Sequence, residues 1–152
     1  MPKTGTTSLS NALRILGYKV CGHRDYLLDH IKQGEWDCVW TVARKYSAFR
    51  DTPWAVIYQD LYRQYPEGKF ILSVRNETKW INSMVRHFGK YPIRMNHWIF
   101  GAPYPKGNEK IYVQKFLDHN QEAVRYFKEK QKELLILGHS TVGFSAYGTV
   151  KT

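Results

Sequence analysis

The first eight residues, Met1-Pro2-Lys3-Thr4-Gly5-Thr6-Thr7-Ser8, run directly into an apolar helical pattern. That pattern consists of Leu9, Ala12, Leu13 and Leu16. A short loop with a glycine, a lysine and hydroxyls at a helix N-terminus presents unpaired backbone N–H groups and the positive end of the helix dipole to an anion. The stretch therefore predicts a phosphate-binding loop. A helix that begins with an ordinary Thr or Ser cap explains the same residues, and this alternative stays open.

The order of residues in the loop decides which phosphate binder it resembles. The loop of nucleotide triphosphatases has four residues between two glycines and then Gly-Lys-Ser/Thr. Here Lys3 precedes Gly5, and no residue corresponds to the earlier glycine. The loop is therefore not predicted to be that of a nucleotide triphosphatase.

Length and composition predict a single domain over residues 1–152. The chain has 43% hydrophobic residues and a mean hydropathy of −0.52, and it contains neither an internal repeat nor an apolar run near the roughly 20 residues of a bilayer span. There is no N-terminal signal pattern. We therefore expect a soluble, cytoplasmic protein.

The net charge indicates the kind of binding partner, and the cysteine pattern indicates the state of the thiols. A net charge of +10 predicts an anionic partner, which is a nucleotide, a sulfated or acidic acceptor, or a nucleic acid. Cys21 and Cys38 have neither metal-ligand spacing nor the density of a disulfide scaffold, so both are predicted to be buried thiols.

Helical and strand patterns alternate along the chain. Gly17 is the predicted C-cap of the first helix. The further predicted segments are a strand at 18–21, a weak helix at 26–33, a helix that starts at Thr52-Pro53, a buried parallel strand at 69–74, a helix opened by Thr78, an irregular stretch at 90–110, a helix at 111–130 and a strand at 134–137. This order predicts an α/β fold, a parallel sheet flanked by helices whose ligands bind at the carboxyl ends of the strands.

Arg75 lies at the end of the predicted strand 69–74, and Ser83 follows about two turns into the next helix. A guanidinium and a hydroxyl suit a compact phosphate group. Taken alone, the two residues are better explained as an ion-pair partner at a strand end and a surface hydroxyl.

Several ordered motifs resemble the P-loop-like sulfotransferases over about residues 1 to 137. Members of this family have Lys/Arg-Thr-Gly-Thr, then Asp-x-Pro, then a strand that ends in Val-Arg. The matching segments are Pro2 to Ser8; Asp51-Thr52-Pro53-Trp54; Tyr65-Pro66 with Lys69 to Arg75, Trp80 and Ser83; and Pro105-Lys106-Gly107 with His119-Asn120. Such an ordered set is more specific than any one of its motifs.

The resemblance implies a three-layer P-loop-like fold and transfer of a sulfuryl group from 3′-phosphoadenosine 5′-phosphosulfate (PAPS) to a hydroxyl or amine acceptor. It implies that the 5′-phosphosulfate is held by Lys3, Thr4, Gly5, Thr6, Thr7 and Ser8. Arg75 and Ser83 would hold the 3′-phosphate, and Lys3 would also stabilise charge during transfer. No metal is expected to take part.

Acceptor activation needs a general base, for which Asp51 is the candidate because it matches the region of the catalytic His or Glu in related sulfotransferases. An N-cap for the helix at Thr52-Pro53 is the alternative. His23 and His119 are further candidates for the base. The aromatic residues Trp98, Phe100 and Tyr104 are expected to line the acceptor site, to stack on adenine or to form local core, and Lys106-Gly107 is a weaker phosphate candidate.

Two segments depart from the family pattern. Relatives have a short apolar strand before the loop, and this sequence starts at Met1 inside the loop, so we expect it to lack that strand. Residues 137–152 form a divergent tail without helical periodicity. A catalytically inactive, nucleotide-binding relative is therefore the alternative function.

Two other classes fit less well. A nucleotide kinase should have Gly-Lys-Ser/Thr and a strand-end Asp for magnesium, and neither is found. A nucleic-acid-binding module fits the charge, but the basic residues are spread throughout and no RNA or DNA signature occurs.

Overall fold

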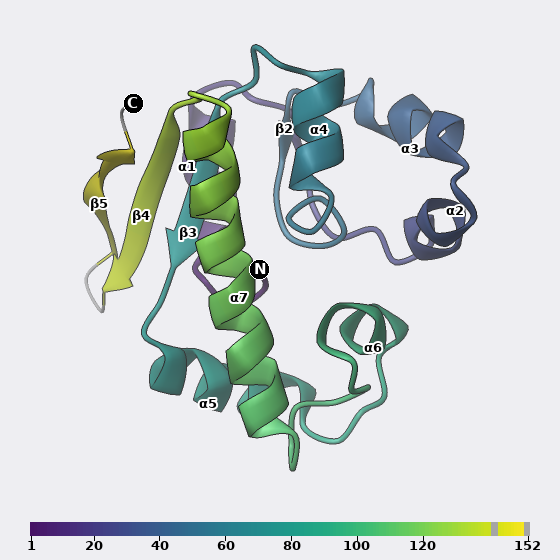
Figure 1. Ribbon diagram of the computed structural model, residues 1–152, viewed down its shortest axis with the longest axis vertical. Coiled ribbons are helices and arrows are strands. Elements are labelled where there is room, and N and C mark those ends of the chain that lie inside the picture. The colour runs from purple at the N-terminus through teal and green to yellow at the C-terminus, as the bar shows by residue number, and fades with distance from the viewer. Residues whose placement is uncertain (141–142, 151–152) are drawn as a thin grey trace. The chain divides into compact units, whose positions relative to one another are not determined.

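Helices and short strands alternate along the chain (Figure 1). The computed structural model describes residues 1–140 and 143–150, with only the backbone described from residue 139 on. The described chain divides into two compact units. Unit 1 contains Met1–Pro2 and Thr6–Pro66, and unit 2 contains Lys3–Gly5 and the residues from Glu67 on.

Unit 1 consists of four helices and two short strands among the described residues. They are α1 (Thr6–Ile15), β1 (Val20–Cys21), α2 (Leu27–Gln33), α3 (Trp36–Ala43), β2 (Ala48–Phe49) and α4 (Tyr58–Gln64). β1 and β2 pair in parallel. The predicted C-cap of α1 is confirmed, because Gly17 has a φ of 87° and the backbone N–H of Tyr18 donates to the carbonyl of Leu13 at 3.0 Å.

One helix start in unit 1 was predicted wrongly. Residues 51–57 form turns instead of helix, and α4 begins only at Tyr58. The N–H of Ala55 donates to the carbonyl of Asp51 at 2.9 Å, and the Thr52–Pro53 peptide bond is cis. Asp51 is therefore not the N-cap of a helix at Thr52-Pro53.

Unit 2 is built on a sheet with the strand order β3-β4-β5. Its elements are β3 (Phe70–Val74), α5 (Glu77–Phe88), α6 (Arg94–Phe100), α7 (Glu109–Glu129), β4 (Leu134–Ser140) and β5 (Gly143–Val150). β3 and β4 are parallel, as predicted, whereas β5 is antiparallel to β4. The predicted divergent tail thus includes the end of β4 and all of β5, and residues 141–142 and 151–152 lie outside the described residues.

An aromatic core holds the helices of unit 2 together. Trp80 of α5 stacks on Phe116 of α7 with ring centroids 4.2 Å apart, and Phe100 of α6 stacks on Tyr112 of α7 at 4.1 Å. All four side chains are buried. The stretch 90–110, predicted to be irregular, thus contains a helix whose last residue, Phe100, contributes to this core.

The described units form a mixed helix-and-strand fold with small parallel pairings, consistent with the predicted α/β class. The three-layer arrangement stays a prediction. Among the described residues, no helix is both long and apolar enough to cross a bilayer.

Candidate functional site

The loop before α1 is a turn with two residues in the left-handed region of the backbone. Lys3 and Gly5 have φ values of 62° and 88°, whereas Thr4 between them does not have a positive φ. Successive backbone N–H groups in a turn that contains a left-handed residue can form a concavity for anions. α1 follows at once, with no acidic side chain in its first turn. The geometry suits a phosphate or sulfate group.

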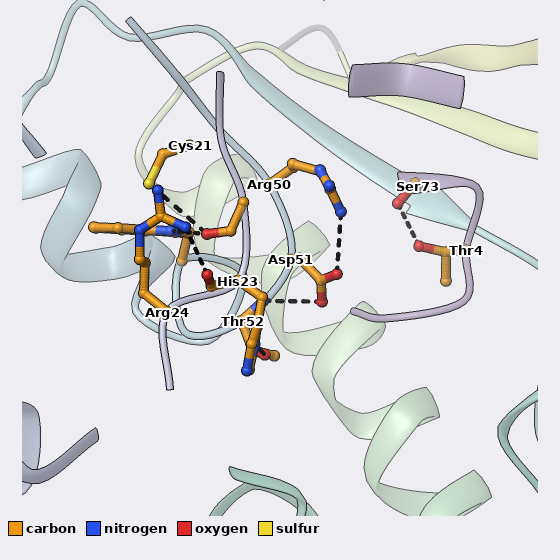
Figure 2. Close-up of polar contacts among 10 residues, drawn as sticks. Thr4, Cys21, His23, Arg24, Arg50, Asp51, Thr52 and Ser73 are labelled. Atoms are coloured by element: carbon orange, nitrogen blue, oxygen red, sulfur yellow. Dashed lines mark hydrogen bonds and ion pairs between the residues drawn. The ribbon is translucent and has the colours of Figure 1, made fainter. Parts of the chain in front are cut away.

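Two contacts within unit 2 hold the loop against the end of β3. The Thr4 Oγ1 and Ser73 Oγ atoms lie 2.7 Å apart, and the two residues are only 0% and 8% exposed. Figure 2 shows these hydroxyls pointing toward each other. Arg75 Nη1 donates to the carbonyl of Lys3 at 2.9 Å. The hydroxyl of Thr4 is therefore already bonded to Ser73.

Unit 1 gathers polar side chains at the carboxyl ends of its two parallel strands. The segment after β1 contains His23, and the segment after β2 contains Asp51 and Thr52. The Arg24 N–H donates to the Thr52 carbonyl at 3.0 Å, and His23 Nδ1 lies 2.8 Å from Thr52 Oγ1 (Figure 2). Carboxyl ends of parallel strands are the usual position of ligand sites in α/β proteins.

Asp51 is held on both sides of its carboxylate. Its Oδ1 accepts from the Thr52 N–H at 3.0 Å, and its Oδ2 lies 3.3 Å from Nη1 of Arg50. Its side chain is only 18% exposed, and its backbone φ is 67°. The structure thus brings the predicted base Asp51 and the further candidate His23 to the same Thr52.

A family model of the sulfotransferase domain matches residues 1–140. The chain belongs to this family. The match includes the loop, the Asp51 segment and strand β3, which Arg75 follows. No curated protein matches the chain.

Several other predicted residues of this sulfotransferase domain can now be located. Thr6, Thr7 and Ser8 form the first turn of α1, where Thr6 is buried and the other two are exposed. Ser83 is half-buried in α5, a helix whose N-cap Asn76 accepts from the Lys79 N–H at 3.1 Å.

His119 lies in α7, where burial lowers the pKa of its imidazole to about 3. A group with that pKa is a weak base at neutral pH. Asp51, His23 and His119 all stay predictions for the base.

The aromatic candidates have different environments. Phe100 is fully buried in the core of unit 2, so it is local core, one of the predicted alternatives. Trp98 and Tyr104 are half-buried. In the segment Lys106-Gly107, the N–H of Gly107 donates to Glu109 Oε1 at 2.9 Å, which lowers the pKa of that carboxyl. The N–H of Gly107 therefore already donates a hydrogen bond within the protein.

The prediction for the cysteines is half wrong. Cys21 is buried, as predicted, and burial raises the pKa of its thiol. Cys38 is exposed. In α3 the buried residues are Val39 and Ala43, four positions apart (43 − 39 = 4) and thus on one face of the helix, so the preceding residue Cys38 lies off that face.

Sequence reasoning did not single out Ser73, and it named Thr52 only as part of a motif and of a predicted helix start. Each lies beside a predicted site residue but bonds to a partner far away in the chain, Thr4 in one case and His23 in the other. A serine in an otherwise apolar strand is the one local signal for Ser73.

Proposed function

We propose that this sulfotransferase domain transfers a sulfuryl group from PAPS to a hydroxyl or amine acceptor. The observation that carries the proposal is the loop of alternating backbone conformation, with Lys3 and Gly5 at positive φ and Arg75 bonded to the carbonyl of Lys3. An anion-binding turn with two cationic residues suits a ligand that carries several phosphate or sulfate groups.

In the proposed complex, the backbone N–H groups from Lys3 to Ser8 and the Lys3 ammonium bind the 5′-phosphosulfate. The hydroxyls of Thr6, Thr7 and Ser8 can donate further hydrogen bonds. Arg75 and Ser83 bind the 3′-phosphate. Arg75 has five N–H donors, and its bond to the Lys3 carbonyl uses one of them, which leaves others for an anion.

The transfer step breaks the bond between sulfur and the bridging oxygen, which keeps the electron pair and stays on the phosphate. A new bond forms between sulfur and the acceptor oxygen or nitrogen. Lys3 and the loop amides stabilise the charge that develops on the bridging oxygen. These residues thus contribute by position and electrostatics.

Asp51 is the proposed general base, which takes the proton of the acceptor. Its contact with Arg50 and its bond from the Thr52 N–H fix the orientation of the carboxylate. His23 is the alternative base, because its imidazole shares the Thr52 hydroxyl. We expect Asp51→Asn to lower kcat by about 10²- to 10⁴-fold with little change in nucleotide affinity. If His23→Ala has that effect and Asp51→Asn does not, the imidazole is the base.

Calorimetric titration with 3′-phosphoadenosine 5′-phosphate tests nucleotide binding. ATP and the same nucleotide without its 3′-phosphate are the comparison ligands. We expect selective binding of the 3′-phosphorylated compound, and we expect Arg75→Ala to lose on the order of 2–4 kcal/mol of binding free energy. Ser73→Ala is the matched control, because it removes a loop contact and leaves the cation in place.

Equal affinity for all three nucleotides would refute the assignment of the 3′-phosphate site. Selective binding without sulfuryl transfer from ³⁵S-labelled PAPS to any hydroxyl or amine acceptor would instead identify the inactive, nucleotide-binding relative.

A further inference from the structure

The turn between α2 and α3 brings together three side chains with metal-binding atoms. His30 lies in the last turn of α2, Glu35 follows the helix, and Cys38 lies in the first turn of α3. One donor atom from each residue lies within 4.8 Å of the other two. Within the part of the chain that the structure describes, this is the one such group of His, Cys, Asp or Glu residues. It belongs to neither the loop nor the Asp51 cluster.

Backbone contacts hold this turn in place. Gly34 ends α2 with a φ of 75°, and the N–H of Glu35 donates to the carbonyl of His30 at 2.8 Å. The N–H of Cys38 donates to the carbonyl of Glu35 at 3.2 Å. Buried Val39 follows Cys38 directly in the chain. The donors are thus on a fixed backbone, while their side chains can still rotate because all three are partly or fully exposed.

We propose that His30, Glu35 and Cys38 bind a thiophilic divalent cation of the Zn²⁺ type, with water as the fourth ligand. An imidazole, a thiolate and a carboxylate are the three donor types found at tetrahedral zinc sites. Ca²⁺ and Mg²⁺ prefer oxygen ligands, and two of the three donors here are a nitrogen and a sulfur. The set therefore selects a softer cation.

The distances are compatible with a small adjustment of side chains. Bonds of about 2.0–2.3 Å at tetrahedral angles place donor atoms roughly 3.3–3.7 Å apart. His30 Nδ1 and Glu35 Oε2 are 2.6 Å apart and form an ion pair, so the metal must separate them by roughly 1 Å. Rotation of the exposed Cys38 side chain can bring its thiolate within bonding distance of the metal.

A plain ion pair between His30 and Glu35 is the competing explanation. It needs no thiol, whereas a metal site of this composition does. The role of Cys38 therefore separates the two explanations.

The test is a titration of the reduced protein with Co²⁺, which gives a sulfur-to-metal charge-transfer band in the near ultraviolet only when a thiolate binds. We expect the band to saturate at one equivalent and to disappear on addition of Zn²⁺. Cys38→Ser should abolish the band. His30→Ala should weaken binding by more than tenfold, since loss of even an outer-shell partner typically costs 10- to 100-fold.

Two variants serve as controls. Cys21→Ala removes the buried thiol, and His87→Ala removes an exposed imidazole in α5; both should keep the wild-type titration. Absence of the band in the wild-type protein, or its persistence in Cys38→Ser, would overturn the proposal. The proposal would also be overturned if His87→Ala lost the band while His30→Ala bound Co²⁺ with the wild-type affinity. None of these outcomes bears on sulfuryl transfer.

Discussion

The hydroxyl pair of Thr4 and Ser73 allows a quantitative test of how the loop is attached to unit 2. The two oxygens are 2.7 Å apart, and both residues are buried. Removal of one partner leaves the other hydroxyl without this bond, which costs about 1–3 kcal/mol at a buried site. We therefore expect Thr4→Val and Ser73→Ala each to lower the free energy of unfolding by about that amount.

The double variant Thr4→Val/Ser73→Ala should lose less than the sum of the two single variants. Neither hydroxyl remains in it, so no buried partner is left behind, and the coupling energy should be about 1–2 kcal/mol. Urea denaturation followed by circular dichroism measures all four free energies. Strictly additive losses would refute the reasoning, because two groups that do not interact add within roughly 0.3–0.5 kcal/mol.

Three further predictions concern single residues. Lys3→Gly should leave the free energy of unfolding unchanged or raise it by up to about 1 kcal/mol in a denaturation experiment, since glycine accepts a φ of 62° without strain. The same variant should lower the rate of sulfuryl transfer in a transfer assay. Asn76→Ala should cost about 1 kcal/mol through loss of the α5 N-cap, and Asn76→Asp should restore it in the same denaturation experiment. His119 has a pKa lowered from 6.5 to about 3 in the folded protein, so the unfolded chain binds more protons between these values and stability should fall as pH drops from 6.5 toward 3. His119→Gln should flatten that part of the pH profile, and an unchanged slope would contradict the assignment.

The elements predicted well from the sequence are those with long or strong patterns. α5 and α7 repeat apolar residues over several turns, and β3 is a nearly continuous apolar run after a turn signal. β2 has only two residues and exists through its pairing with β1, so its sequence carries no pattern of its own. α3 has eight residues, and no side chain caps its start at Glu35. Its formation depends on packing against α2, which a local pattern does not record.

The candidate site likewise contains residues that could be predicted from the sequence and residues that could not. Residues in contiguous motifs, such as Lys3 and Asp51, could be predicted because loop chemistry is local. Their partners could not, because Ser73 meets Thr4 across 69 positions and His23 meets Thr52 across 29. Prediction of such contacts requires the strand pairing that brings the segments together. The same holds for the His30, Glu35 and Cys38 group, which depends on the left-handed turn at Gly34.

The two predicted catalytic residues, Lys3 and Asp51, both have a strained backbone conformation. Among the described residues, three that are not glycine have positive φ: Lys3, Asp51 and Gln131. Such conformations cost on the order of 1 kcal/mol and persist only where the surroundings impose them. At Lys3 the Arg75 guanidinium holds the carbonyl, and at Asp51 the carboxylate is fixed by Arg50 and the Thr52 N–H. Neither strain is needed for a strand or helix to form, since Lys3 lies before α1 and Asp51 lies between β2 and α4. A conformation that disfavours folding and orients a charged side chain is expected where that orientation serves chemistry, which supports the roles proposed for Lys3 and Asp51.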